Sequence, residues 1–208
     1  MFKLAIIVGT DRPNSKSQLM AEHVKTLYVG LGVDAQIYSM AFFPLRHVVG
    51  GPYEENIPEV EEFIAPILAS DALLFIIPEY NGSFPGILKM FIDYLPFPEA
   101  FQAKPIAYIG ISAGAFGSLR AVEQFQMVAN YRNALSYPER LFISRFSANF
   151  SIENGLGDID GFVDCDDYLR IGGIVNIFTG GDCTTEKAFA NGERTAHYAT
   201  LHAVACVT

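Results

Sequence analysis

An unbroken apolar segment that runs straight into a polar loop is the feature that most constrains the fold. Residues 72–77 are all apolar, and residues 78–89 hold two glycines, two prolines and the polar side chains of Glu79, Tyr80 and Asn81. Such a run is typical of a strand buried on both faces, as in a parallel sheet covered by helices. Ligands of open parallel sheets bind where loops leave the carboxyl ends of strands, so this loop is a candidate cofactor site.

Short apolar strands alternate with amphipathic, helix-length segments up to Ser144. Strands are expected at about residues 2–9, 34–38, 71–77, 105–111 and 140–144, helices at about 17–31, 58–69, 85–95 and 119–135, and a loop at 44–58. Strands separated by helices imply a parallel sheet with helices on both faces. Five such units predict an α/β, flavodoxin-like, doubly wound fold with the strand order 2-1-3-4-5.

The pattern weakens after Ser144. A loop is expected at residues 149–167, a helix at 164–178 that contains Gly172 and Gly173, and one or two short helices at 184–208. Paired glycines disfavour a helix interior, and Gly180-Gly181 then interrupts the chain. We therefore expect a flavodoxin-like domain over residues 1–181 and a C-terminal extension over 182–208.

Composition excludes several classes of protein. The net charge of −9 argues against a nucleic-acid partner, and no apolar run approaches the ~18 residues of a membrane span. The first eight residues lack the cleavage site of a secretory signal and fit a first strand. The three cysteines, Cys165, Cys183 and Cys206, show no paired spacing, as is usual for free thiols in a reducing cytosol. We expect a cytoplasmic protein.

Two clusters of potential metal ligands lie in the C-terminal part, but neither has the spacing of a metal site. A calcium loop around Asp158 and Asp160 would need an acid at position 156, which is Leu156. His197 and His202 are five residues apart and so do not share a helix face. We expect no metal site.

Two further polar loops are expected at the same sheet edge. Residues 9–18 place hydroxyl, amide and guanidinium groups just before a helix N-terminus, where a phosphate is favoured. This loop is neither a Walker A loop nor a dinucleotide fingerprint, and Ser15 or Ser17 could simply cap the helix. Residues 112–118 contain Gly114 and Gly117, which permit a tight turn with inward N–H groups that suits the pyrimidine edge of a flavin.

Three motifs resemble the NAD(P)H-dependent FMN reductase family, flavodoxin-like enzymes that include quinone, chromate and azo-dye reductases. They are Gly9-Thr10-x-Arg12-x-x-Ser15-x-Ser17, Pro78-Glu79-Tyr80-Asn81-Gly82-Ser83-x-Pro85-Gly86-x-Leu88-Lys89-x-x-Ile92-Asp93, and Ser112-x-Gly114-x-x-Gly117. The resemblance covers residues 1–144. The chain departs from the family at Met90 and Tyr94, where Asn and Trp are common, and at Ser118, where Gly is common.

The resemblance implies roles for individual residues. Thr10, Arg12, Ser15, Ser17 and Gln18 would hold the FMN phosphate, Pro78, Glu79, Tyr80, Asn81 and Gly82 would line the ribityl chain and ring, and Ser112, Gly114 and Gly117 would contact the far side of the ring. Lys89 and Asp93 match the family's pair at a subunit interface, which implies a homodimer or homotetramer. Four residues apart on a helix, they could equally form a plain surface pair.

The implied function is an FMN-dependent NAD(P)H oxidoreductase that reduces free flavin, quinone or a similar small acceptor. The cofactor supplies the redox chemistry, so no side chain is predicted as a catalytic acid or base. Two alternatives stay open. One is a flavodoxin-type electron carrier without NADH or NADPH turnover, and the other is a flavin-binding regulatory or scaffold protein whose C-terminal region contacts a partner.

Overall fold

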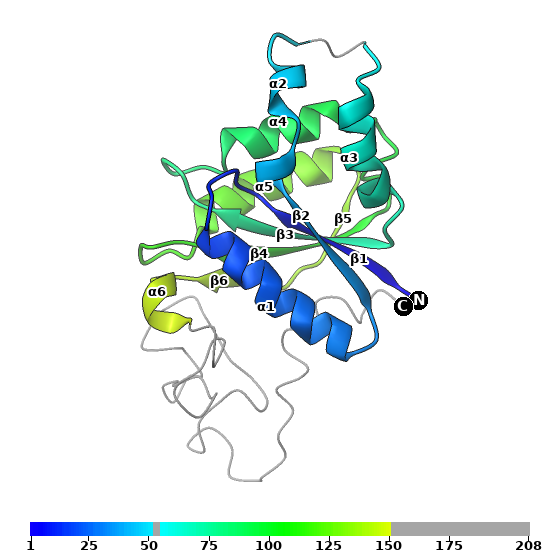
Figure 1. Cartoon of the computed structure of the whole chain (residues 1–208). Helices are drawn as coiled ribbons and strands as arrows, with labels where there is room; N and C mark the ends of the chain where they lie inside the picture. Colours follow the sequence, from blue (N-terminus) through cyan, green and yellow to red (C-terminus); the bar gives the residue numbers. More distant parts are fainter. Residues whose placement is uncertain (52–54, 151–208) are drawn as a thin grey trace.

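A parallel sheet with helices on both faces is formed by residues 1–51 and 55–150, the part of the chain that the computed structural model describes (Figure 1). The strands are β1 (Lys3–Val8), β2 (Asp34–Ser39), β3 (Ala72–Pro78), β4 (Pro105–Ile111), β5 (Leu135–Ser136) and β6 (Leu141–Ile143). All pairings are parallel, in the order β2-β1-β3-β4-β5, and β6 also pairs with β4. The predicted architecture and strand order are confirmed.

Most helices begin and end close to the predicted residues. They are α1 (Lys16–Gly30), the 3-10 helix η1 (Met40–Phe42), α2 (Leu45–Val48), α3 (Pro58–Leu68), α4 (Gly86–Tyr94), α5 (Leu119–Tyr131) and α6 (Phe146–Asn149). Two expectations need correction. The predicted loop at 44–58 contains α2, where Tyr94 Oη donates a hydrogen bond to the carbonyl of Val48. The helix predicted to reach residue 135 ends at Tyr131, because Asn133 adopts a positive φ and Leu135 joins the sheet.

The fifth strand is divided into two short pieces, whereas a single strand at 140–144 was expected. β5 pairs with Pro105 and Ile106, and β6 pairs with residues 109–111 of the same neighbour. Between the two pieces lies Pro138, which has no N–H to donate to a ladder. The chain therefore leaves β4 at the proline and returns at Leu141.

Two apolar cores, one on each face of the sheet, hold the layers together. Ala5, Ile7, Leu73, Phe75 and Ile77 face α3, α4 and α5, whereas Leu4, Ile6, Val8, Leu74 and Ile76 face α1 and α6. Neighbouring residues of one strand point to opposite faces, so both faces of β1 and β3 are buried. Figure 1 shows the same division, with α1 and α6 on one side of the sheet and the other long helices opposite.

Several expectations concern residues outside the described ranges. They are the loop and helices after residue 150, the domain boundary at 181, the three cysteines, and the acidic and histidine clusters. Within residues 1–51 and 55–150, no helix has the length and apolar character needed to cross a membrane. The same ranges contain no cluster of three or more His, Cys, Asp or Glu residues arranged to hold a metal ion.

Candidate functional site

The loops that follow β1 and β3 are in direct contact at the carboxyl edge of the sheet. Thr10, which is buried, shares a hydrogen bond of 2.5 Å with the hydroxyl of Tyr80. The guanidinium of Arg12 lies over the ring of Tyr80, 4.3 Å from its centroid. Residues 70 positions apart in the sequence thus form one continuous surface, as the topology of adjacent parallel strands requires.

The first loop leads into α1 through a side-chain cap. Ser15 Oγ accepts a hydrogen bond of 3.1 Å from the backbone N–H of Gln18, so the capping alternative holds for Ser15. Ser17 is buried in the first turn, and the amide of Gln18 donates to Glu22. Arg12 is exposed, and its guanidinium donates no hydrogen bond within the described residues. With no acidic residue in the first turn of α1, this donor set fits a phosphate group.

The second loop is a tight hairpin turn. The backbone N–H groups of Tyr80 and Ser83 donate to each other's carbonyl oxygens, at 2.8 and 3.1 Å. Asn81 and Gly82 lie between them with φ values of 52° and 78°. Two positive φ values in succession define a type I′ turn, for which Asn-Gly is the preferred pair. The turn fixes the backbone of the loop that the family resemblance implies as a contact of the flavin ring.

Helix α5 supports this turn through two residues that the sequence analysis did not single out. Gln124 accepts a hydrogen bond of 2.6 Å from the Ser83 hydroxyl and donates one of 3.2 Å to the Gly82 carbonyl. Arg120, one helical turn earlier, lies 3.7 Å from a carboxylate oxygen of Glu79. The pair has i, i+4 spacing, but nothing local in the sequence links it to a loop about 40 residues away.

The third loop combines an open glycine with a packed one. The hydroxyl of Ser112 and the backbone N–H of Arg145 both donate to the carbonyl of Gly114, at 2.9 Å each, and a Cβ at Gly114 would meet only open space. Gly117 has φ +58°, and a Cβ there would lie 2.8 Å from backbone and side-chain atoms of Phe142. Gly117 is therefore explained by close packing against β6, whereas Gly114 remains at an open position.

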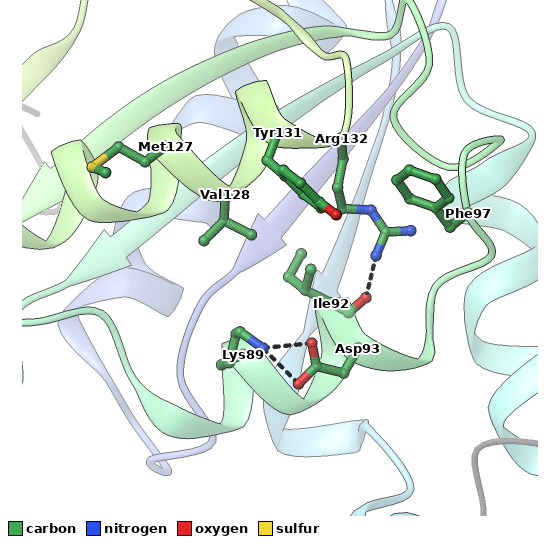
Figure 2. A pocket seen from close by; sticks show the side chains of 8 residues that line it. All are labelled: Lys89, Ile92, Asp93, Phe97, Met127, Val128, Tyr131 and Arg132. Atoms are coloured by element: carbon green, nitrogen blue, oxygen red, sulfur yellow. Dashed lines mark hydrogen bonds and ion pairs between the residues drawn. The ribbon is translucent and has the colours of Figure 1, made fainter.

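A groove between α4 and α5 lies away from these loops, and Figure 2 shows its lining. This α4–α5 groove has a volume of about 370 Å³ and is lined by Lys89, Ile92, Asp93, Phe97, Met127, Val128, Tyr131 and Arg132. Lys89 Nζ contacts both carboxylate oxygens of Asp93, at 2.6 and 2.7 Å. Met127 and Tyr131 are 72% and 79% exposed, so the groove is bordered by large apolar side chains that are open to solvent.

Arg132 forms the buried end of the groove. Its guanidinium donates to the carbonyl oxygens of Ile92, Leu95 and Pro96 at 2.7–2.8 Å and so caps the C-terminus of α4. Burial lowers the pKa of Arg132, while nearby carboxylates act in the opposite direction. Because its charge is held by backbone carbonyls, this arginine stabilises the fold of the groove.

The fold and the edge of polar loops define a flavodoxin-like oxidoreductase. The model of the NADPH-dependent FMN reductase family matches residues 2–148, and the chain belongs to this family. This confirms the predicted family, the flavin-dependent oxidoreductase class and the FMN and NAD(P)H requirement, and it leaves the flavodoxin-type carrier with less support.

Relatives differ in how much of their length the chain spans. An NAD(P)H-dependent FMN reductase from Pseudomonas aeruginosa is 52% identical over 66 residues, which is 31% of this chain and 36% of the relative. A 2-hydroxy-1,4-benzoquinone reductase from Burkholderia sp is 31% identical over 168 residues, 72% of this chain and 85% of the relative. An FMN-dependent NADPH-azoreductase from Staphylococcus aureus is 29% identical over 117 residues, 54% of this chain and 62% of the relative.

Solved structures support the fold. The flavoenzyme NAD(P)H:(acceptor) oxidoreductase FerB from Paracoccus denitrificans superposes with a TM-score of 0.64 at 24% identity, covering 77% of this chain and 88% of the other. An oxidoreductase from Corynebacterium diphtheriae superposes with a TM-score of 0.59 at 21% identity, covering 77% and 87%. At these identities the similarity establishes the architecture alone.

Proposed function

We propose that the chain binds FMN at the carboxyl edge of its sheet and uses it to reduce quinones or similar small acceptors with NAD(P)H. The contact between Thr10 and Tyr80 is the observation that carries the proposal. It joins residues 9–18, the proposed phosphate loop, and residues 78–89, which contain the proposed ring loop, into one surface. Family membership supplies the cofactor that this surface would bind.

The proposed binding residues come from the three loops. They are Thr10, Arg12, Ser15, Ser17 and Gln18 for the phosphate, Pro78, Glu79, Tyr80, Asn81 and Gly82 for the ribityl chain and ring, and Ser112, Gly114 and Gly117 for the far side of the ring. Arg12 would give the phosphate a charge-assisted hydrogen bond. Gly117 would act through the shape of its turn, since its position is buried against Phe142.

When bound, FMN supplies the redox chemistry by taking a hydride from NAD(P)H and passing two electrons to the acceptor. The chain's own contribution is to bind and orient. Tyr80 is held by Thr10 on one side, and the turn that follows it is held by Gln124 on the other. Because the loop is already held in place, ordering it on cofactor binding costs less conformational entropy.

Quinones are the preferred acceptor class in this proposal. The Burkholderia relative, of which the chain covers 85%, is named a benzoquinone reductase, and the Staphylococcus relative is named an azoreductase. Quinones and azo compounds are both conjugated acceptors that are reduced in two-electron steps. A quinone would gain those electrons and two protons to become a hydroquinone, while NAD(P)H becomes NAD(P)⁺.

The test is to purify the protein with FMN, record its visible spectrum and follow NAD(P)H oxidation with quinones, azo dyes, metal oxyanions and free FMN. We expect flavin absorbance and fastest turnover with a quinone. Absence of both flavin binding and NAD(P)H oxidation would contradict the proposal. Tight FMN binding without any NAD(P)H oxidation would instead favour the electron carrier.

We also propose a homodimer formed through the α4–α5 groove. Exposed apolar side chains gather there around the Lys89–Asp93 pair, as at a protein interface with a polar component. Light scattering coupled to gel filtration would detect the dimer. A monomer at all concentrations would leave Lys89 and Asp93 as a surface pair.

We infer a cytoplasmic location, where NAD(P)H is supplied and unpaired cysteines stay reduced. We further propose that residues 182–208 extend beyond the flavin-binding domain of residues 1–181, whose family match covers residues 2–148 and does not reach this boundary. Truncation after Gly181 is then expected to leave FMN affinity and oligomeric state unchanged. A loss of either would assign the extension to the domain or to a partner contact.

A further inference from the structure

A second pair of an arginine and an aromatic ring lies at the carboxyl edge, on the other side of the ring loop from Arg12 and Tyr80. The guanidinium of Arg120 lies over Phe116, 4.8 Å from the ring centroid. Phe116, in the loop between β4 and α5, is 52% exposed, and the Arg120 side chain is 55% exposed. The proposed FMN contacts use the first pair, through Arg12 and Tyr80, and leave this second pair without a role.

The hydrogen-bond donors of Arg120 are available to a ligand. Arg120 forms an ion pair with Glu79, but the nearest carboxylate oxygen is 3.7 Å away, which is beyond hydrogen-bond length. Arg120 donates no hydrogen bond to any other residue of the described ranges. Arg132 differs, since three of its N–H groups are spent on backbone carbonyls. Stacking on Phe116 orients the guanidinium plane while its edges stay open.

We propose that Phe116 and Arg120 bind the adenosine end of NADPH, with Arg120 donating to the 2′-phosphate and the Phe116 ring stacking on the adenine. Arginine recognises phosphate through paired N–H groups, and a nucleobase stacks on an exposed aromatic face. The inference rests on the proposed FMN site: Arg120 lies 3.7 Å from Glu79, a residue proposed to line the flavin, so a ligand held by Arg120 would lie beside that site. It makes NADPH the preferred donor over NADH.

The test measures the binding of adenosine 2′,5′-bisphosphate and of 5′-AMP to the FMN-loaded full chain by calorimetry. We expect the bisphosphate to bind more tightly, and Arg120→Ala to weaken it about tenfold while 5′-AMP is unaffected. Arg120→Lys should restore part of the loss, because it keeps the charge without the planar fork. Phe116→Ala should weaken both ligands, since both carry adenine.

Arg140 provides a matched control. It lies 5.3 Å from the centroid of Phe142 and 3.8 Å from Glu123, yet it lies between β5 and β6 and not in one of the three loops. Arg140→Ala should therefore leave bisphosphate binding unchanged. Steady-state kinetics add a second readout: Arg120→Ala should raise the KM for NADPH relative to the KM for NADH about tenfold, because only NADPH carries the 2′-phosphate, whereas loss of the contact with Glu79 affects both donors alike.

Equal bisphosphate affinity in wild type and Arg120→Ala would overturn the inference, as would a parallel rise in the KM values for NADPH and NADH. These outcomes are separate from failure of the proposed function. A protein that binds FMN and oxidises NAD(P)H without discrimination at Arg120 would refute only this inference. A protein that binds no FMN would refute the proposed function, and calorimetry of the bisphosphate with the flavin-free full chain would still decide whether Arg120 binds the 2′-phosphate.

Discussion

The carboxyl edge of the sheet and the α4–α5 groove differ in what they expose. The edge presents loops, hydroxyls and the guanidinium groups of Arg12 and Arg120, which lie over aromatic rings and donate no hydrogen bond within the described residues. The groove presents large apolar side chains. The guanidinium of Arg132, which lines it, donates hydrogen bonds to backbone carbonyls. The difference teaches that guanidinium N–H groups are open to a ligand where a small anion is proposed, even though Arg120 is ion-paired with Glu79, and are hydrogen-bonded to the backbone where a second protein surface is proposed.

Helix α5 belongs to both regions. Arg120 and Gln124 contact the ring loop, and Val128 and Tyr131, four and seven residues after Gln124, line the groove. Residues at this spacing lie on one face of a helix. One face of α5 thus connects the proposed cofactor site with the proposed subunit contact. Substitutions at the two ends of this face are therefore needed to test the two sites independently.

The largest effect is expected at Gly117, where the edge depends on packing. Gly117→Val would place side-chain atoms against Phe142 at a positive φ, and we expect a loss of about 3 kcal/mol in the free energy of unfolding. Urea denaturation measures it. The neighbouring Ser118 also has a positive φ, of 69°, so Ser118→Gly relieves strain and should change stability by less than about 1 kcal/mol. Equal effects of the two variants would contradict the packing role of Gly117.

The second largest effect is expected on FMN affinity, at the carboxyl edge of the sheet. Arg12→Ala should weaken FMN binding by about 1.5–3 kcal/mol, because a charged hydrogen bond to the phosphate is lost. Quenching of flavin fluorescence gives the dissociation constant, and Lys25→Ala, on the exposed side of α1, is the control. An unchanged dissociation constant would remove Arg12 from the site.

Met127 tests the other region. Met127→Asp would bury a carboxylate in the proposed interface, and the dimer dissociation constant should rise at least tenfold, or about 1.4 kcal/mol. Analytical ultracentrifugation measures this, with Val29→Asp as a matched control because Val29 is a similarly exposed apolar residue on α1. FMN affinity should stay unchanged. A dimer of wild-type strength would place the interface elsewhere.

Gln124 is expected to give the smallest effect, because it acts on the cofactor only through the turn at Gly82. Gln124→Ala removes two hydrogen bonds to that turn, and FMN affinity should fall by about 0.5–1.5 kcal/mol. The control is Gln126→Ala, on the same helix, which removes the hydrogen bond that Arg140 donates to Gln126. This variant should leave FMN affinity unchanged. Equal losses in the two variants would show that α5 stability, and not the turn, is being measured.

Local sequence patterns predicted the parts of the fold that local forces determine. The apolar runs at 72–77 and 105–111 became buried strands, and the Asn81-Gly82 pair adopts the positive φ values that its chemistry allows. What the sequence could not provide was contact across long separations. Gln124 meets Gly82 from 42 residues away, and Gly117 is needed only because Phe142 packs against it. The break of the fifth strand had a local signal, Pro138, that the strand prediction did not use.

The most direct test of the central claim is the position of FMN in a crystal structure of the loaded protein. The account predicts the phosphate at the first turn of α1 beside Arg12, with the ring against the turn formed by Tyr80, Asn81 and Gly82. Flavin bound in the α4–α5 groove, or a phosphate far from Arg12, would contradict it.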